Sequence, residues 1–283
     1  MRLVVFTDLD GSLLDQETYS YENARGALKL LRERQIPLVF TTSKTRLEVE
    51  TLQADMNILE PFIVENGAAV FFPDAYRGLR MEVGFHRPPY HVIQLGAAYG
   101  EIRTFLRTLG PRFNIKGFGD LKAEEIGRLT GLPPNQVEMA MQREFTEPFI
   151  IDDDSSLIDL QSLAGTRGFK IVRGGRFYHL IGAEQDKGRA VRLAVSAFIS
   201  HADHQPVTIG LGDGENDIPM LESVDIPILI PHPDGSYEDV DLPNLRKARD
   251  PGSRGWNEMV MGLLQEMALS APGSPFKTPL HPA

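Results

Sequence analysis

The stretch VVFTDLDGS, residues 4–12, joins a run of apolar residues to two aspartates, Asp8 and Asp10, and a glycine, Gly11. A short run this apolar indicates a strand buried on both faces, as the strands of a parallel sheet are. The carboxyl ends of parallel strands meet at one edge of the sheet, and ligands bind there. Gly11 lets the chain turn sharply beside the two acids. The stretch therefore predicts a polar functional site at the carboxyl end of the first strand of a parallel sheet.

Strands alternate with helical patterns on both sides of a middle segment that has a different rhythm. Apolar strands are predicted at residues 2–7, 36–42, 61–64 and 207–212, with amphipathic helices between or after them. This alternation favours an α/β fold, a doubly wound parallel-sheet (Rossmann-like) core with an inserted α+β cap domain. The predicted division is a core in two parts, residues 1–83 and 183–269, a cap at residues 84–182, and a flexible tail rich in proline, serine and glycine at residues 270–283.

The composition excludes several classes of function. A net charge of −10 argues against non-specific binding of nucleic acid, which needs a basic surface. The absence of cysteine excludes disulfides, thiolate nucleophiles and cysteine zinc sites, so a metal must use oxygen or histidine ligands. The apolar runs are far shorter than the ~20 residues of a membrane helix, and acids interrupt the N-terminal run too soon for a signal peptide. We therefore expect a cytoplasmic protein with no membrane partner.

A second acidic loop follows another predicted strand. In GLGDGENDIPML, residues 210–221, an apolar strand ends in Asp213 and Asp217. Close carboxylates repel unless a cation lies between them, and Mg²⁺ prefers such oxygen ligands. The acids after the first strand could alone belong to a surface turn, and a glycine-rich turn before a helix cap would explain Asn216 and Asp217. Neither alternative explains an acid at each of two strand ends, so we predict a metal site.

Two further stretches suit a phosphate group. In VFTTSKT, residues 39–45, a strand ends in hydroxyls, so Ser43 or Thr42 could donate a hydrogen bond to a phosphoryl oxygen. Lys187, in QDKGRAV, could neutralise charge on both the phosphate and the nucleophile. Taken singly, the hydroxyls at residues 39–45 could be a helix cap, and Lys187 could be a solvated surface residue.

Together these segments resemble a known family. DLDGS, TTSKT, DKG and GDGENDIPML, in this order and spacing, are similar to the four motifs of the haloacid dehalogenase-like phosphatases, in the subgroup with a large α/β cap between the second and third motifs. The resemblance implies that Asp8 attacks phosphorus to form an aspartyl-phosphate. Asp10 would protonate the leaving alcohol and then activate water. The remaining implied roles are Mg²⁺ ligation by Asp8, Asp213 and the backbone carbonyl of Asp10, support by Asp217, phosphate contacts by Ser43 and Asn216, and charge neutralisation by Lys187.

Further stretches resemble a narrower family. TSKTRLEVE, ENGAAVFFP, REFTEPFII and RGGRFYHLIGAEQDKGRAV are similar to the mannosyl-3-phosphoglycerate phosphatases, with similarity over most of residues 3–225. The resemblance implies hydrolysis of mannosyl-3-phosphoglycerate to mannosylglycerate, a compatible solute. Such a substrate needs an arginine for its carboxylate and acids or amides for its hydroxyls. Candidate substrate ligands are Lys44 and Arg46 from the core and Arg143, Glu147, Gly174, Gly175, Arg176 and His179 from the cap, although a cap hairpin with a surface turn would explain any one of the cap residues.

Other functions are also compatible with the same motifs. The core motifs also suit a phosphatase for glucosyl-3-phosphoglycerate, sucrose phosphate or simple hexose phosphates, and a phosphomutase that returns phosphate to a sugar. A protein of another class, a non-catalytic regulator that binds a phosphosugar, is the remaining alternative. Asp8, Asp10, Asp213 and Lys187 together count against it, because a pure binding protein needs no nucleophile.

Overall fold

The computed structural model describes residues 3–270 apart from 80, 153, 175–176 and 200–204. Within them, nine strands form the larger of two sheets, in the order β13-β12-β11-β1-β2-β3-β4-β6-β5. The strands are β1 (Leu3–Thr7), β2 (Leu38–Thr41), β3 (Phe62–Val64), β4 (Ala69–Pro73), β5 (Phe85–Arg87), β6 (Tyr90–Gln94), β11 (Val207–Gly212), β12 (Ile226–Leu229) and β13 (Arg246–Lys247). The neighbours from β13 to β3 pair in parallel, and β4, β6 and β5 extend the sheet antiparallel.

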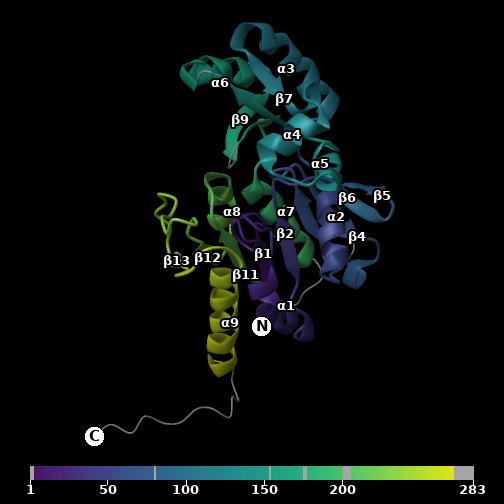
Figure 1. Ribbon diagram of the computed structural model, residues 1–283. Helices are drawn as coiled ribbons and strands as arrows, with labels where there is room; N and C mark the ends of the chain where they lie inside the picture. The colour runs from purple at the N-terminus through teal and green to yellow at the C-terminus, as the bar shows by residue number, and fades with distance from the viewer. Residues whose placement is uncertain (1–2, 80, 153, 175–176, 200–204, 271–283) are drawn as a thin grey trace, which may run out of the picture.

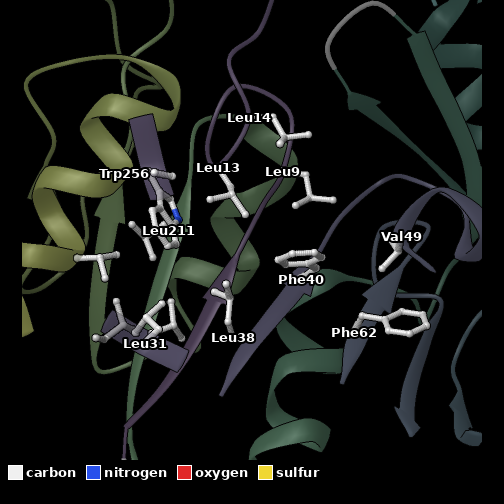
Figure 2. Close-up of a cluster of buried hydrophobic side chains, with 14 of the residues drawn as sticks. Leu9, Leu13, Leu14, Leu31, Leu38, Phe40, Val49, Phe62, Leu211 and Trp256 are labelled. Atoms are coloured by element: carbon white, nitrogen blue, oxygen red, sulfur yellow. The ribbon is translucent and has the colours of Figure 1, made fainter. Parts of the chain in front are cut away.

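Helices cover both faces of this sheet, because successive strand residues point to opposite faces. Val5 and Phe40 pack under one layer, and Val4, Phe6 and Val39 pack under the other. Figure 2 shows the first layer, where Leu9, Leu13, Phe40 and Trp256 belong to one cluster of buried side chains. The first layer is α1 (Arg25–Glu33), α2 (Arg46–Asp55) and α9 (Gly252–Ser270), and the second is α7 (Lys187–Ile199) and α8 (Ile218–Leu221). The predicted doubly wound α/β core is confirmed.

Strand register brings the predicted site residues to one edge. Thr7, the last residue of β1, pairs with Leu211 of β11 and with Phe40 of β2. The N–H of Asp8 donates to the carbonyl of Leu211 over 2.9 Å, so β1 and β11 end side by side. Asp8 and Asp213 therefore follow neighbouring strands at the same edge of the sheet. The loop after β2 lies on the opposite side of β1 from β11.

A second, four-stranded sheet lies in the middle of the chain, in the order β7-β8-β10-β9. Its antiparallel strands β7 (Ile115–Gly117), β8 (Glu147–Ile151), β9 (Phe169–Gly174) and β10 (Phe177–Gly182) are accompanied by α3 (Tyr99–Phe113), α4 (Ala123–Thr130), α5 (Pro134–Ala140) and α6 (Leu157–Gly165). Short 3₁₀ helices are η1 (Glu22–Ala24), η2 (Tyr76–Gly78), η3 (Phe118–Asp120), η4 (Asp154–Ser156) and η5 (Glu215–Asp217). In Figure 1 this sheet lies at one end of the molecule and α1 and α9 at the other.

The period of β10 decides which side chains face the larger sheet. Tyr178 and Leu180 pack with α3 and α6 on one face of the second sheet. Phe177 and His179 alternate with them and line a cavity on the opposite face. β10, with one face in a core and one at the cavity, therefore supplies an aromatic and a titratable side chain to the cavity lining.

Two of the segment boundaries predicted from the sequence can be compared with the observed elements. β5 and β6 pair within the larger sheet, although the cap was expected to begin at residue 84. This pairing favours a cap that starts near residue 95, and both cap boundaries stay proposals. Of the expected tail, residue 270 ends α9, and residues 271–283 lie outside the described residues. No helix in the described part of the chain is both long and apolar enough to cross a lipid bilayer.

Candidate active site

Four charged side chains from three separate parts of the chain meet at the carboxyl edge of the larger sheet. Lys187, the first residue of α7, donates hydrogen bonds to Asp8 Oδ1 over 2.7 Å and to Asp217 Oδ1 over 2.5 Å. One carboxylate oxygen each of Asp8, Asp213 and Asp217 lie within 4.8 Å of one another. Lys187 and Asp217 are each only 1% exposed. The structure thus gathers both predicted acidic strand ends and the predicted lysine into one cluster.

Backbone and hydroxyl groups fix the orientation of two of these acids. Asp217 Oδ2 accepts the N–H groups of Asp213 and Gly214, each over 3.1 Å. The Ser12 hydroxyl donates to Asp213 Oδ1 over 2.8 Å, which ties the loop after β1 to the loop after β11. Both oxygens of Asp217 therefore have protein partners. Asp217 holds Lys187 and its own loop in place.

The cluster carries more negative than positive charge. Burial, and then the neighbouring Asp217 carboxylate, raise the pKa of Asp8 to about 7, although Lys187 opposes this rise. Burial and then Asp217 also raise the pKa of Asp213 well above its ordinary value. Burial alone would lower the pKa of Lys187, but the carboxylates of Asp217 and Asp8 outweigh it and raise that pKa. A single lysine does not neutralise the three carboxylates.

A hard divalent cation fits this set of donors. Mg²⁺ takes oxygen ligands and is commonly bound by one or two carboxylates together with substrate phosphate. The raised pKa values of Asp8 and Asp213 are the response of buried acids that have too little positive charge nearby, and a cation would reverse it. Because both oxygens of Asp217 are already bonded to protein groups, Asp8 and Asp213 are the carboxylates best placed to bind such an ion.

Asp10 lies beside the cluster and has a different partner. Its Oδ2 forms an ion pair with Lys44 Nζ over 2.8 Å. Its Oδ1 is buried and has no hydrogen-bond partner among the described residues. Lys44 is itself mostly buried, and Asp10 followed by Glu48 raise its pKa against the opposing effect of burial. Asp10 therefore presents an oriented carboxyl group to the same cavity as Asp8.

A cavity of about 710 Å³ extends from the acid cluster toward the second sheet. Its lining from the larger sheet and its loops includes Asp8, Asp10, Ser43, Lys44, Asp213 and Asn216. Its lining from the middle of the chain includes Phe118, Leu132, Ala140, Arg143, Pro148, Phe177 and His179. The cavity thus has an acidic end suited to a metal and a phosphate, and a mixed cationic and aromatic end suited to an organic group.

Comparison with known proteins agrees with this geometry. A family model described as haloacid dehalogenase-like hydrolase matches residues 5–80. A protein of Persephonella marina named glucosyl-3-phosphoglycerate/mannosyl-3-phosphoglycerate phosphatase is 53% identical over 265 residues, which cover 94% of this chain and 98% of the relative. The mannosyl-3-phosphoglycerate phosphatase of Pyrococcus furiosus is 36% identical over 228 residues, 80% of this chain and 90% of the relative. The chain belongs to the mannosyl-3-phosphoglycerate phosphatase family of haloacid dehalogenase-like hydrolases. It is a phosphoric monoester hydrolase.

The same fold occurs in distant phosphatases. A haloalkanoate-superfamily phosphatase from Bacteroides thetaiotaomicron matches with a TM-score of 0.65 at 20% identity, covering 94% of this chain and 95% of that chain. At this identity the likeness shows the fold alone.

Several predicted ligands line the cavity of this phosphatase. Ser43 and Lys44 line it from the loop after β2, and Arg143 and His179 line it from the middle of the chain. Asn216 also lines it, and its Nδ2 donates to Asn66 Oδ1 over 3.0 Å. These residues are placed where a phosphate and its leaving group can reach them.

Other predicted ligands lie elsewhere. Arg46 forms ion pairs with Glu50 and Glu144, each over 2.8 Å, and Glu147 is fully buried in an ion pair with Arg103 over 2.8 Å. These pairings do not favour substrate contact by either side chain, since the charge of each is already compensated by the protein. Gly174 is the last residue of β9. Gly175 and Arg176 lie outside the described residues.

Sequence reasoning missed some residues of the site. Ser12 follows Gly11 directly, so its place beside a strand-end motif was an available signal. His232 and Glu238 line the cavity and lie 3.5 Å apart, in the loop that follows β12. That loop also leaves the carboxyl end of a parallel strand, which was the signal for the other ligands. Tyr19, another lining residue, had no such signal.

Replacing Gly11 with alanine is expected to lower phosphatase activity at least about 100-fold. Gly11 has a φ of +82°, and an added Cβ would lie 2.3 Å from Asp213 Oδ2. The methyl group would therefore displace the carboxylate of Asp213, a predicted metal ligand. Gly78→Ala is the matched control, because Gly78 has a φ of +73° with nothing within 4 Å of an added Cβ. Both variants should unfold at lower temperature, and only Gly11→Ala should lose activity; equal activities would contradict the steric argument.

Proposed function

We propose that this phosphatase hydrolyses mannosyl-3-phosphoglycerate to mannosylglycerate and phosphate, and that it also accepts glucosyl-3-phosphoglycerate. The observation that carries the proposal is the cavity, which joins the acid cluster to Arg143 and His179. The substrate has a phosphate at one end and a carboxylate and a hexose at the other, which matches a cavity with two chemically different ends. The names of the Persephonella and Pyrococcus relatives support this substrate class, and the double name of the former supports the glucosyl substrate.

In the proposed reaction, Asp8 is the nucleophile. Its carboxylate attacks phosphorus and displaces the alcohol, so that an aspartyl-phosphate forms and the P–O bond to the glycerate breaks. Lys187, bonded to Asp8 Oδ1 over 2.7 Å, orients the carboxylate and balances charge as the phosphate approaches. Mg²⁺, held by Asp8, Asp213 and the backbone carbonyl of Asp10, would supply further positive charge at the phosphoryl oxygens.

Asp10 is the proposed general acid and base. It gives a proton to the departing glycerate oxygen and then takes one from the water that hydrolyses the aspartyl-phosphate. Its ion pair with Lys44 fixes the direction of the carboxyl group. Ser43 and Asn216 contact the phosphoryl oxygens, and Asp217 supports Lys187 through its hydrogen bond to Nζ.

Residues from the middle of the chain, in and around the second sheet, contact the leaving group in this proposal. Arg143 is the proposed partner of the glycerate carboxylate. Burial, followed by the charge of Arg143, lowers the pKa of His179 to about 3, so His179 is neutral at physiological pH and offers an uncharged hydrogen bond. Its Nδ1 is buried and has no partner in the described part of the chain. Phe118 and Phe177 pack edge to face with ring centroids 5.0 Å apart and form an apolar wall for the hexose.

A substrate panel tests the proposal. We expect kcat/KM for mannosyl-3-phosphoglycerate and glucosyl-3-phosphoglycerate to exceed that for p-nitrophenyl phosphate, glucose 6-phosphate and sucrose phosphate by about 100-fold or more, because only the former pair engages Arg143. Release of inorganic phosphate is the measurement. Rates on hexose phosphates equal to those on the glycosyl phosphoglycerates would contradict the proposed substrate. Isomerised product without free phosphate would indicate a mutase.

Metal removal is the companion measurement. EDTA should abolish phosphate release from every ester of the panel, and Mg²⁺ should restore it, because the excess negative charge of the cluster otherwise repels the phosphate. Full activity in EDTA would rule out the metal.

A cytoplasmic location, expected from the sequence, stays a prediction.

A further inference from the structure

Residues 65–67 form a loop at the carboxyl end of β3 with an uncommon backbone conformation. Glu65, Asn66 and Gly67 have φ values of 49°, 61° and 85°, so three consecutive residues adopt the left-handed region that favours glycine. Non-glycine residues hold such angles only where their surroundings fix them, and such positions cluster at functional sites. The side chain of Glu65 supplies many of the fixing contacts.

The carboxylate of Glu65 is fully buried and binds one short segment from the middle of the chain. It accepts the N–H of Glu144 over 2.8 Å, the N–H of Phe145 over 3.1 Å and the hydroxyl of Thr146 over 2.7 Å. Burial raises the pKa of Glu65, and the nearby Arg143 guanidinium and these hydrogen bonds oppose the rise. A carboxylate with three donors from successive residues holds that segment in one position.

The segment that Glu65 holds begins directly after Arg143. Arg143 lines the cavity, and its guanidinium donates to the carbonyl oxygens of Ser43 over 2.6 Å and Ala140 over 2.9 Å. Because Glu144 follows Arg143 in the chain, fixing the Glu144 N–H also fixes the backbone from which the arginine side chain leaves. The position of this guanidinium therefore depends on a carboxylate that does not itself line the cavity.

The same loop contacts the catalytic side of the site. Asn66 accepts the Asn216 amide over 3.0 Å, and the backbone carbonyl of Glu65 accepts Gln185 Nε2 over 2.5 Å. A Cβ on Gly67 would lie 2.7 Å from the backbone nitrogen of Lys187, so the loop packs directly on the start of α7. Residues 65–67 thus join the phosphate-handling groups and the Arg143 segment within one rigid turn.

We infer that Glu65 is a positioning residue for substrate selectivity. Its carboxylate fixes residues 144–146 against the loop of residues 65–67 and thereby sets the Arg143 guanidinium at the end of the cavity that receives the leaving group. The identity of that leaving group, a glycerate with a free carboxylate, rests on the proposed function. The effect of Glu65 on Arg143 does not.

The kinetic test compares two substrates that differ in their leaving groups. In Glu65→Gln, kcat/KM for mannosyl-3-phosphoglycerate should fall about tenfold or more, mainly through KM, while that for p-nitrophenyl phosphate stays within about twofold. Arg143→Gln should act in the same direction. The double variant should be no worse than Arg143→Gln alone, because both changes remove one interaction. Equal losses on both substrates, or additive losses in the double variant, would overturn the inference.

A second measurement does not depend on the substrate. Amide hydrogen exchange of Glu144 and Phe145 should become about tenfold faster in Glu65→Gln, while exchange in β1 and β11 is unchanged. Glu60→Gln is the matched control, because Glu60 is another largely buried carboxylate, bonded to Tyr76 and Arg77, and none of these three residues lines the cavity. It should lower stability without altering substrate preference or exchange at Glu144. Unchanged exchange in Glu65→Gln would defeat the inference, even if the glycosyl phosphoglycerates proved not to be substrates.

Discussion

Asp8→Asn is expected to reduce phosphate release by at least about 10⁴-fold while the affinity for substrate stays within about threefold. An amide has no anionic oxygen to attack phosphorus, so the aspartyl-phosphate cannot form. The amide keeps the size of the carboxylate and can still meet Lys187, which lies 2.7 Å from Asp8 Oδ1. Steady-state phosphate release and calorimetric titration of the variant with mannosyl-3-phosphoglycerate measure the two quantities. Turnover within about tenfold of the parent would mean that Asp8 is not the nucleophile.

The stability of the same variant separates a chemical loss from a folding loss. The pKa of Asp8 rises from 3.8 to about 7 in the folded protein, so in the absence of metal its ionisation destabilises the fold progressively as pH increases between those values. Asparagine cannot ionise and removes this loss. In EDTA at pH 7, Asp8→Asn should therefore unfold at a temperature equal to or above that of the parent. A large fall in melting temperature would instead assign the lost activity to misfolding.

The acidic end of the site was predictable because its geometry is set by local sequence. Asp8 and Asp213 each follow an apolar strand directly, and parallel strands align their carboxyl ends whatever the rest of the chain does. Lys187 was harder, since a lysine at a helix start is usually solvated. The loop around Gly67 packs on the backbone at the start of α7, and the Lys187 side chain is buried where it bonds to Asp8 and Asp217. The motif predicted Lys187 as a site residue, and long-range packing explains why its side chain is buried there.

The organic end of the site was not predictable in the same way. Arg46 and Arg143 are both arginines in segments near the site, and nothing in their local sequence says which one faces the cavity. Glu50 and Glu144 pair with Arg46, while Arg143 is left beside Ser43. Glu50 lies only four residues from Arg46, but the Arg46–Glu144 and Arg143–Ser43 contacts join residues 98 and 100 positions apart, which no sequence period records.

Glu65 is another residue whose role could not be predicted from its local sequence. In the sequence it is one acid before an Asn-Gly pair, a pattern typical of a surface turn. In the structure it is fully buried, because the segment at residues 144–146 covers it and supplies three hydrogen bonds. A buried carboxylate far from its partners in sequence is recognised only when the second sheet is placed against the first.

Lys187→Met is expected to abolish activity and to lower the free energy of unfolding by about 3–5 kcal/mol. The substitution keeps the length and apolar volume of the side chain but leaves the carboxylates of Asp8 and Asp217 buried together without their common cation. The pKa of Lys187 is raised in the folded protein, so its stabilising contribution is fully present at neutral pH and the whole of it is lost in the variant. Chemical denaturation in EDTA at pH 7 gives the magnitude, and a change below about 1 kcal/mol would show that the ion pairs contribute little.

A second substitution separates the two roles of Lys187. Adding Asp217→Asn to Lys187→Met removes one of the two uncompensated carboxylates, so the double variant should regain about half of the lost stability. It should regain no activity, because the cation that balances charge between Asp8 and the incoming phosphate is still missing. Lys187→Met should also lose stability more steeply than the parent as pH rises from about 4 through 7, since Asp8 and Asp213 already have raised pKa values and lose an opposing charge. If the double variant were no more stable than Lys187→Met, the uncompensated charge of Asp217 beside Asp8 would not be the source of the instability.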